Sequence, residues 1–167
     1  QKITDGEQTV MVGYDVRFLS QKFAVAAAEV FAGNGFRVLL MDRPYPTPYV
    51  SFEVKRQGLV GGVVITASHN PSSFNGFKVK ANYGGSATSS ITQAIEERLG
   101  QRDVRRSTAG IDTVAPSPEY FTHLRSLVDW ERIAGSNLQV VVDSMHGSGG
   151  QLLEEMLAET TVQVTTI

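Results

Sequence analysis

A loop of mixed polar residues follows an apolar stretch near the middle of the chain, and we call it the serine loop, residues 66–78. The hydroxyl of Ser68 could act as a nucleophile or carry a phosphate, and the adjacent His69 could move a proton near neutral pH. The amine of Lys78 adds a positive charge. These residue types suit transfer of a phosphoryl group, because that reaction depends mainly on positioning and on charge stabilisation.

The expected path of the serine loop brings its two ends together. Pro71 holds Asn70 out of the helical region. Asn75-Gly76 is a strong two-residue reversal signal, which would return the chain antiparallel to the strand that precedes the loop. On that path Lys78 could approach Ser68.

Each of these residues also has an ordinary explanation. Lys78 and Lys80 would share one face of the returning strand, which is as typical of a solvated strand as of a phosphate site. A loop histidine such as His69 more often bonds to backbone than takes part in catalysis. Loops of α/β proteins commonly contain a serine, so position alone supports Ser68 weakly.

The elements around the serine loop alternate between strand and helix, which implies parallel strands joined by right-handed crossovers. We therefore expect an α/β fold, a three-layer α/β/α sandwich with a mixed, mostly parallel sheet. The serine loop would lie at the carboxyl edge of this sheet, where open α/β sheets bind ligands. Predicted strands cover residues 9–14, 36–41, 59–66 and 76–80, and predicted helices begin at Ser20 and at Pro48.

The pattern changes after residue 100. The stretch 100–115 lacks periodicity and, despite its arginines, is more typical of a solvated connector than of an anion site. A second βαβ unit is then expected to start near Gly135. Its predicted elements are a strand at 138–142, a helix at 148–157 and a strand at 161–167, preceded by a helix capped by Ser117.

Composition excludes several classes of protein. The 167 residues carry a net charge of −2, with 41% hydrophobic residues and no cysteine. Disulfide frameworks, thiolate metal sites and catalytic thiols are thereby excluded from this stretch, and a reducing compartment, the cytoplasm, is favoured. No apolar run approaches the roughly 18 residues that a membrane span needs, and no basic stripe predicts nucleic acid as a partner.

Two other motifs are weak. The run 146–150, His-Gly-Ser-Gly-Gly, resembles a phosphate cradle but has neither the Walker lysine nor the dinucleotide spacing, so glycines of a tight turn explain it better. Ser68 beside His69 could belong to a hydrolase, yet the chain has no Gly-x-Ser-x-Gly elbow. Adjacent side chains also rarely face each other as nucleophile and base.

Residues 66–71, Thr-Ala-Ser-His-Asn-Pro, followed by Asn-Gly-Phe-Lys at 75–78, closely resemble the active-site signature of the α-D-phosphohexomutases, the phosphoglucomutase and phosphomannomutase family. Thr66 at the head of the signature is more similar to the glucose and mannose phosphate mutases than to the glucosamine phosphate mutases. The resemblance extends over most of the chain, through the segments 13–20, 46–48 and 141–147.

The resemblance implies a phosphohexomutase, most closely a phosphoglucomutase, that moves a phosphoryl group between the 1- and 6-positions of a hexose phosphate through a hexose 1,6-bisphosphate. Ser68 matches the serine that carries the phosphoryl group. Lys78 is then expected to stabilise charge, His69 to assist proton movement or fix the loop, and Asn70 to contact the substrate. Mg²⁺ would be held by the phosphate on Ser68 and by three aspartates of a DxDxDR loop in the second domain, which this sequence does not contain.

The sequence also departs from the family pattern, first of all at its start. The family's opening segment, with its catalytic arginine, would precede Gln1, so Arg17 matches a later Gly-x-Asp-x-Arg turn, where it would bind substrate or form a structural ion pair. We expect an N-terminal fragment, inactive without the C-terminal domains. Residues 1–134 would form the first domain without its opening strand and helix, and 135–167 would begin the second. Alternatives are a phosphomannomutase or a non-catalytic phosphosugar-binding module.

Overall fold

The computed structural model describes residues 8–167. The chain divides into two compact units, Gln1–Ala115 and Pro116–Ile167. The first contains β1 (Thr9–Tyr14), α1 (Ser20–Gly33), β2 (Arg37–Met41), α2 (Thr47–Gln57), β3 (Gly61–Ile65), β4 (Phe77–Ala81), α3 (Ser89–Glu96) and β5 (Ile111–Val114).

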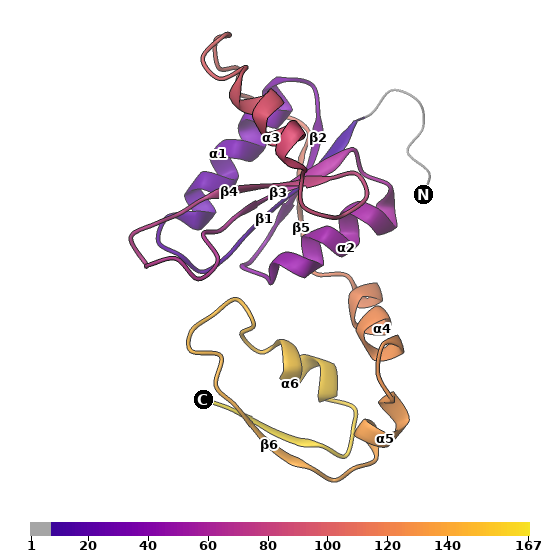
Figure 1. Cartoon of the computed structure of the whole chain (residues 1–167). Coiled ribbons are helices and arrows are strands. Elements are labelled where there is room, and N and C mark those ends of the chain that lie inside the picture. Colours follow the sequence, from indigo (N-terminus) through magenta and orange to yellow (C-terminus); the bar gives the residue numbers. More distant parts are fainter. Residues whose placement is uncertain (1–7) are drawn as a thin grey trace. The chain divides into compact units, whose positions relative to one another are not determined.

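The five strands of the first unit form one mixed sheet in the order β4-β3-β1-β2-β5. β1 pairs in parallel with β2 and with β3, and β4 is antiparallel to β3. The chain steps from β1 to one neighbour through α1 and returns past β1 to the other through α2. Right-handed crossovers therefore place α1 and α2 on opposite faces of the sheet (Figure 1), which confirms the expected α/β architecture.

The central strand β1 is buried along its whole length, as its nearly continuous apolar sequence predicts. On one face, two glycines let α2 approach closely. A Cβ on Gly13 would lie 2.5 Å from a methyl carbon of Val50, and one on Gly62 would lie 2.9 Å from a methyl carbon of Val54. Both valines are fully buried, so this tight contact fixes α2 against the strands that lead to the serine loop.

The expectation that residues 100–115 are a solvated connector holds for residues 100–110, nearly all of which are exposed, but it missed a strand. Residues 111–114 form β5, which pairs in parallel with β2 at the edge of the sheet. Just before it, the Ser107 amide donates to the carbonyl oxygen of Glu29 at 3.0 Å, and Arg106 forms an ion pair with the Glu29 carboxylate at 3.3 Å. β5 was missed because a four-residue edge strand with exposed central side chains has no periodicity of its own.

The second unit contains α4 (Pro118–Ser126), α5 (Trp130–Ala134), β6 (Gln139–Val142), α6 (Leu152–Leu157) and β7 (Gln163–Thr166). β6 and β7 are parallel, so the predicted βαβ start of a second α/β unit is present. The helix between them is shorter than the predicted 148–157. Gly149 and Gly150 precede it in a turn, closed by a 2.9 Å hydrogen bond from the Ser144 hydroxyl to the Gly150 carbonyl oxygen.

The border between the two units also differs from the expected one. We expected a border between residues 134 and 135, whereas the units divide between Ala115 and Pro116. Arg125 of α4 donates to the carbonyl oxygen of Met156 at 2.8 Å, and the Thr161 amide donates to that of Ala134 at 2.9 Å. These bonds tie α4 and α5 to the second unit.

Helix capping also departs from the sequence-based expectation. Neither Ser20 nor Ser117 makes a capping hydrogen bond, and the Ser20 hydroxyl donates to Asp15 instead.

Among residues 8–167, no helix combines the length and the apolar character that crossing a bilayer requires.

Candidate active site

The serine loop leaves and re-enters the sheet at one point. Ile65 at the end of β3 pairs with Phe77 at the start of β4, and the Thr66 amide donates to the Gly76 carbonyl oxygen at 3.0 Å. A Cβ on Gly76 would lie 2.7 Å from the Thr66 carbonyl oxygen, so only glycine fits there without a shift of backbone. The expected antiparallel return of β4 is thus observed, but the chain does not reverse at Asn75-Gly76: the turns of the loop lie at residues 67–70 and 71–74, and residues 75–76 belong to its base.

Ser68 is exposed at the carboxyl end of β3. Its backbone φ is 56°, in the left-handed region that a non-glycine residue rarely adopts, and its amide donates to the Thr66 hydroxyl at 3.0 Å. Such a conformation persists only where the surroundings hold it, and it is often found at functional sites. The loop therefore presents the Ser68 hydroxyl to solvent in a fixed, uncommon backbone conformation.

The neighbours of Ser68 differ in how closely they approach its hydroxyl. Nδ1 of His69 lies 3.5 Å from Oγ of Ser68, at the outer limit of a hydrogen bond. Asn70 is exposed beside them, and its backbone carbonyl oxygen accepts a hydrogen bond from Arg17. The His69 ring is therefore at the limit of hydrogen-bond distance from the Ser68 hydroxyl, while the Asn70 side chain is exposed to solvent.

Lys78 and Lys80 occupy the same face of β4 but different environments. They pair with Val64 and Gly62, which lie on the face of the sheet that α2 covers. Lys78 is exposed, and its side-chain amine makes no hydrogen bond or ion pair with another residue in the described range 8–167. Lys80 is 7% exposed, with its amine 3.5 Å from the Ser86 hydroxyl. Of these two lysines, only Lys78 is therefore accessible to a ligand, where the sequence had placed two cations together.

Burial, and secondarily the charge of Lys78, lowers the pKa of Lys80 from its ordinary value of 10.5. The amine of Lys80 therefore binds its proton more tightly in the unfolded chain than in the folded one, so its positive charge lowers the stability of the fold. This effect is full at pH values below the pKa of Lys80 in the folded state and disappears as the pH rises towards 10.5. We expect Lys80→Met to resist urea more than the wild type near neutral pH and to lose this advantage as the pH approaches 10.5. The exposed Lys22→Met should show no such pH-dependent difference, and a constant Lys80→Met difference would contradict the prediction.

Arg17 reaches the serine loop from the turn between β1 and α1. The Nη atoms of its guanidinium donate only to backbone carbonyl oxygens of residues 51 to 57 positions away, and none of these bonds involves the Ser68 hydroxyl. Sequence reasoning placed Arg17 near the site and gave Asn75 a place in the chain reversal, but it assigned no contact to Asp15 or Asn75, which hold the same turn and loop together. The Gly-x-Asp-x-Arg spacing was the available signal.

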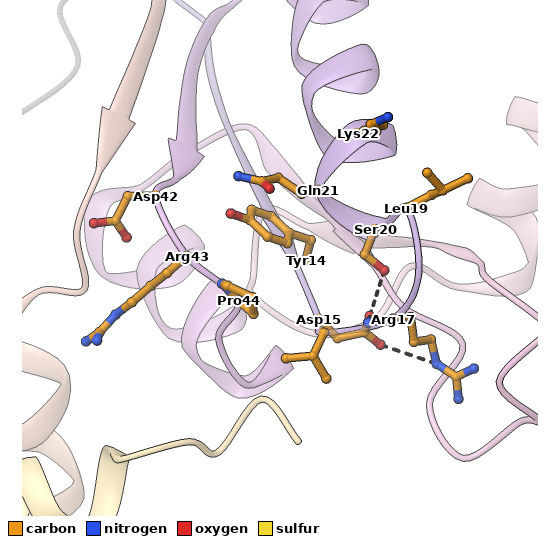
Figure 2. A pocket seen from close by; sticks show the side chains of 11 residues that line it. Tyr14, Asp15, Arg17, Leu19, Ser20, Gln21, Lys22, Asp42, Arg43 and Pro44 are labelled. Atoms are coloured by element: carbon orange, nitrogen blue, oxygen red, sulfur yellow. Dashed lines mark hydrogen bonds and ion pairs between the residues drawn. The ribbon is translucent and has the colours of Figure 1, made fainter. Parts of the chain in front are cut away.

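A pocket of about 420 Å³ lies beside this turn, at the carboxyl ends of β1 and β2. Figure 2 shows Tyr14 and Gln21 on one side of it and Asp42 with Arg43 on the other. Burial first, and then the charge of Asp42, raises the pKa of Tyr14 above its ordinary value of 10.0. The chains from β1 and β2 turn to opposite faces here, which is where open α/β sheets form ligand crevices.

The described residues do not offer the expected Mg²⁺ a complete set of ligands. Residues 8–167 contain no cluster of three or more histidine, cysteine, aspartate or glutamate side chains that could hold a metal ion. Mg²⁺ prefers several oxygen ligands in a near-octahedral arrangement, and of those expected only the Ser68 oxygen belongs to the serine loop. The described residues therefore do not fit a self-contained magnesium site.

Known proteins similar to this chain were found both by sequence and by structure. A phosphoglucomutase from Staphylococcus aureus (strain MRSA252) is 32% identical over 160 residues, which cover 89% of this chain and 29% of that protein. That of strain USA300 is 34% identical over 163 residues, with the same shares. A solved structure from Thermus thermophilus, whose description names a phosphomannomutase, superimposes with a TM-score of 0.88 at 33% identity, covering 97% of this chain and 37% of that one.

The chain thus spans about three tenths of the length of the curated relatives that it matches. "Phosphoglucomutase/phosphomannomutase, alpha/beta/alpha domain I" matches residues 1–106, and the corresponding domain II matches residues 118–167. The first match alone covers more than half of the chain and contains the serine loop. The chain belongs to the phosphoglucomutase/phosphomannomutase family.

Proposed function

We propose that Ser68 is the phosphoryl carrier of a phosphohexomutase, with phosphoglucomutase as the first candidate. The observation that carries the proposal is the exposed Ser68 hydroxyl, held in a left-handed backbone conformation at the carboxyl end of β3. The names of the Staphylococcus aureus relatives support a glucose phosphate, whereas the description of the Thermus thermophilus structure supports a mannose phosphate as the second candidate. The absence of cysteine favours the cytoplasm as its compartment.

The proposed reaction has two transfers. A hydroxyl of the hexose phosphate attacks the phosphorus on Ser68, the Oγ–P bond breaks, and a hexose 1,6-bisphosphate forms. After the bisphosphate reorients, Oγ attacks its other phosphorus, the bond from that phosphorus to the sugar oxygen breaks, and the sugar oxygen takes up the proton that Oγ gives up. The phosphoryl group is then again on Ser68. In the first step the proton that leaves the sugar hydroxyl must be accepted. His69, whose Nδ1 lies 3.5 Å from Oγ of Ser68, is the candidate to accept it.

A phosphate on Ser68 would carry about −1.5 to −2 charges at neutral pH, and Lys78 is the exposed cation of the serine loop that is available to offset it. Residues 8–167 hold no complete metal site, and the chain lacks the length of its relatives. We therefore propose that turnover needs the full-length polypeptide, by which we mean this chain with the remaining segments that its relatives carry. Steady conversion of glucose 1-phosphate by the 167 residues alone would overturn this division of labour.

Mass spectrometry of the intact protein tests the carrier role directly. The full-length polypeptide, first treated with phosphatase, should gain the mass of one phosphoryl group after incubation with glucose 1,6-bisphosphate and Mg²⁺. Peptide mapping should place it on Ser68. A Ser72→Ala variant, which changes another exposed serine of the same loop, should still gain it. No gain of mass, or a phosphate mapped to any other residue, refutes the carrier role and leaves a binding module.

A further inference from the structure

The guanidinium of Arg17 is surrounded by the backbone of the serine loop. Its Nη1 donates to the carbonyl oxygens of Pro71 at 2.8 Å and Phe74 at 3.0 Å. Its Nη2 donates to the carbonyl oxygens of Ser68 at 2.9 Å and Asn70. One planar cation thus collects four carbonyl groups spread over seven consecutive residues, which is possible only if the loop folds around it.

Asp15 anchors this cation from the other side (Figure 2). Its Oδ2 lies 3.5 Å from Nε of Arg17, and its Oδ1 accepts hydrogen bonds from the Arg17 amide at 3.0 Å and from the Ser20 hydroxyl at 2.8 Å. The Arg17 and Asp15 side chains are 14% and 15% exposed. An ion pair so little exposed is less screened by salt than a surface pair.

A second link holds the far end of the loop to the same turn. Nδ2 of Asn75 donates to the Ser20 hydroxyl at 2.9 Å and to the Phe18 carbonyl oxygen at 3.3 Å, while its Oδ1 accepts from the Gly76 amide at 2.9 Å. Ser20 is 1% exposed and also bonds to Asp15, so both links end on one carboxylate.

We propose that Arg17, anchored by Asp15, is the positioning residue for Ser68: its guanidinium holds the serine loop so that the Ser68 hydroxyl keeps its place and its exposure. This inference rests on the proposed function of Ser68. The uncommon backbone conformation of Ser68 would relax in a loop that Arg17 did not hold. One of the four hydrogen bonds is made to the carbonyl oxygen of Ser68 itself.

The hydrogen-bond inventory separates this role from substrate binding. A guanidinium has five N–H groups, four on its two Nη atoms and one on Nε. The four carbonyl oxygens accept from the four Nη groups, and Nε faces the Asp15 carboxylate at 3.5 Å in an ion pair, so no Nη group is left for a phosphate. A lysine at position 17 would keep the charge but not the planar fork, and it could not bond four separated acceptors in the same way.

Amide hydrogen exchange of the 167-residue chain tests the positioning directly. In Arg17→Lys and Arg17→Met, the amides of Ser68, Asn70 and Phe74 should exchange at least about tenfold faster than in the wild type, because each lost bond came from a charged donor. The β3 amides should be unchanged. Arg106→Lys, which changes an exposed arginine paired with Glu29, should leave the loop as it is. Loop exchange within about twofold of the wild type in Arg17→Lys would overturn the proposal.

Kinetics of the full-length polypeptide give the second readout. Positioning predicts that Arg17→Lys lowers kcat at least about tenfold while KM for the hexose phosphate changes less than about threefold. Added methylguanidinium, but not methylammonium, should restore activity to Arg17→Ala. A raised KM with unchanged kcat would instead make Arg17 a substrate contact and overturn positioning. If Ser68→Ala is fully active, the carrier role itself fails, whatever the exchange rates are, so the two failures are distinguishable.

Discussion

Ser68→Ala in the full-length polypeptide is expected to lower mutase activity by at least about 10³-fold, the scale of loss that follows removal of a covalent nucleophile. The reason is that alanine has no oxygen to which a phosphoryl group can be attached, so neither transfer of the proposed cycle can occur. Coupled conversion of glucose 1-phosphate to glucose 6-phosphate measures the rate. The melting temperature should change little, because Ser68 is exposed and its side chain has only a loose contact with His69.

Two control variants separate loss of the hydroxyl from disruption of the loop. Ser72→Ala removes a hydroxyl from the same exposed loop and should keep activity within about twofold. Ser68→Thr retains a hydroxyl, but its β-branched side chain is disfavoured at a positive φ, so it should be intermediate. Undiminished activity of Ser68→Ala would refute the carrier role, and an equal loss in Ser72→Ala would point to loop disruption rather than lost chemistry.

The order of strands and helices in the first unit could be predicted from local pattern because its central strands are buried on both faces and its helices are amphipathic. β1 is the clearest case, with six consecutive buried residues. By contrast, β5 exists only through its pairing with β2, and α4 joins the second unit through bonds such as that of Arg125 with Met156, which no local pattern encodes.

In the candidate site, too, some features could be predicted from the local sequence and others could not. Ser68 could be found from its motif and from its place after a buried strand. The environment of Lys80 could not, because alternation assigns it the same face as Lys78 and says nothing of what covers that face. The partners of Arg17 are backbone carbonyl groups more than fifty residues away, and carbonyl groups have no signature in the sequence. Sequence thus identifies the reacting group more readily than the contacts that hold it.

Lys78→Met in the full-length polypeptide is expected to lower kcat by about 10²- to 10³-fold, the range seen when one charge-stabilising donor is removed from a transition state. Lys78 is exposed, its amine makes no hydrogen bond or ion pair with residues 8–167, and it lies near the start of β4, where the serine loop re-enters the sheet. Its charge is therefore not neutralised by the described part of this chain and can act on a transferring phosphoryl group. Lys78→Arg, which keeps the charge, should retain more activity, as steady-state kinetics would measure.

Lys80→Met provides the matched control, since it removes the next lysine along the same strand face. Because Lys80 is buried beside Ser86, it should leave kcat within about threefold. Equal losses in the two variants would mean that β4 tolerates neither change, and the role of Lys78 would then be structural. Loss in Lys78→Met alone would mean that accessibility, which differs between the two lysines, decides which one serves the reaction.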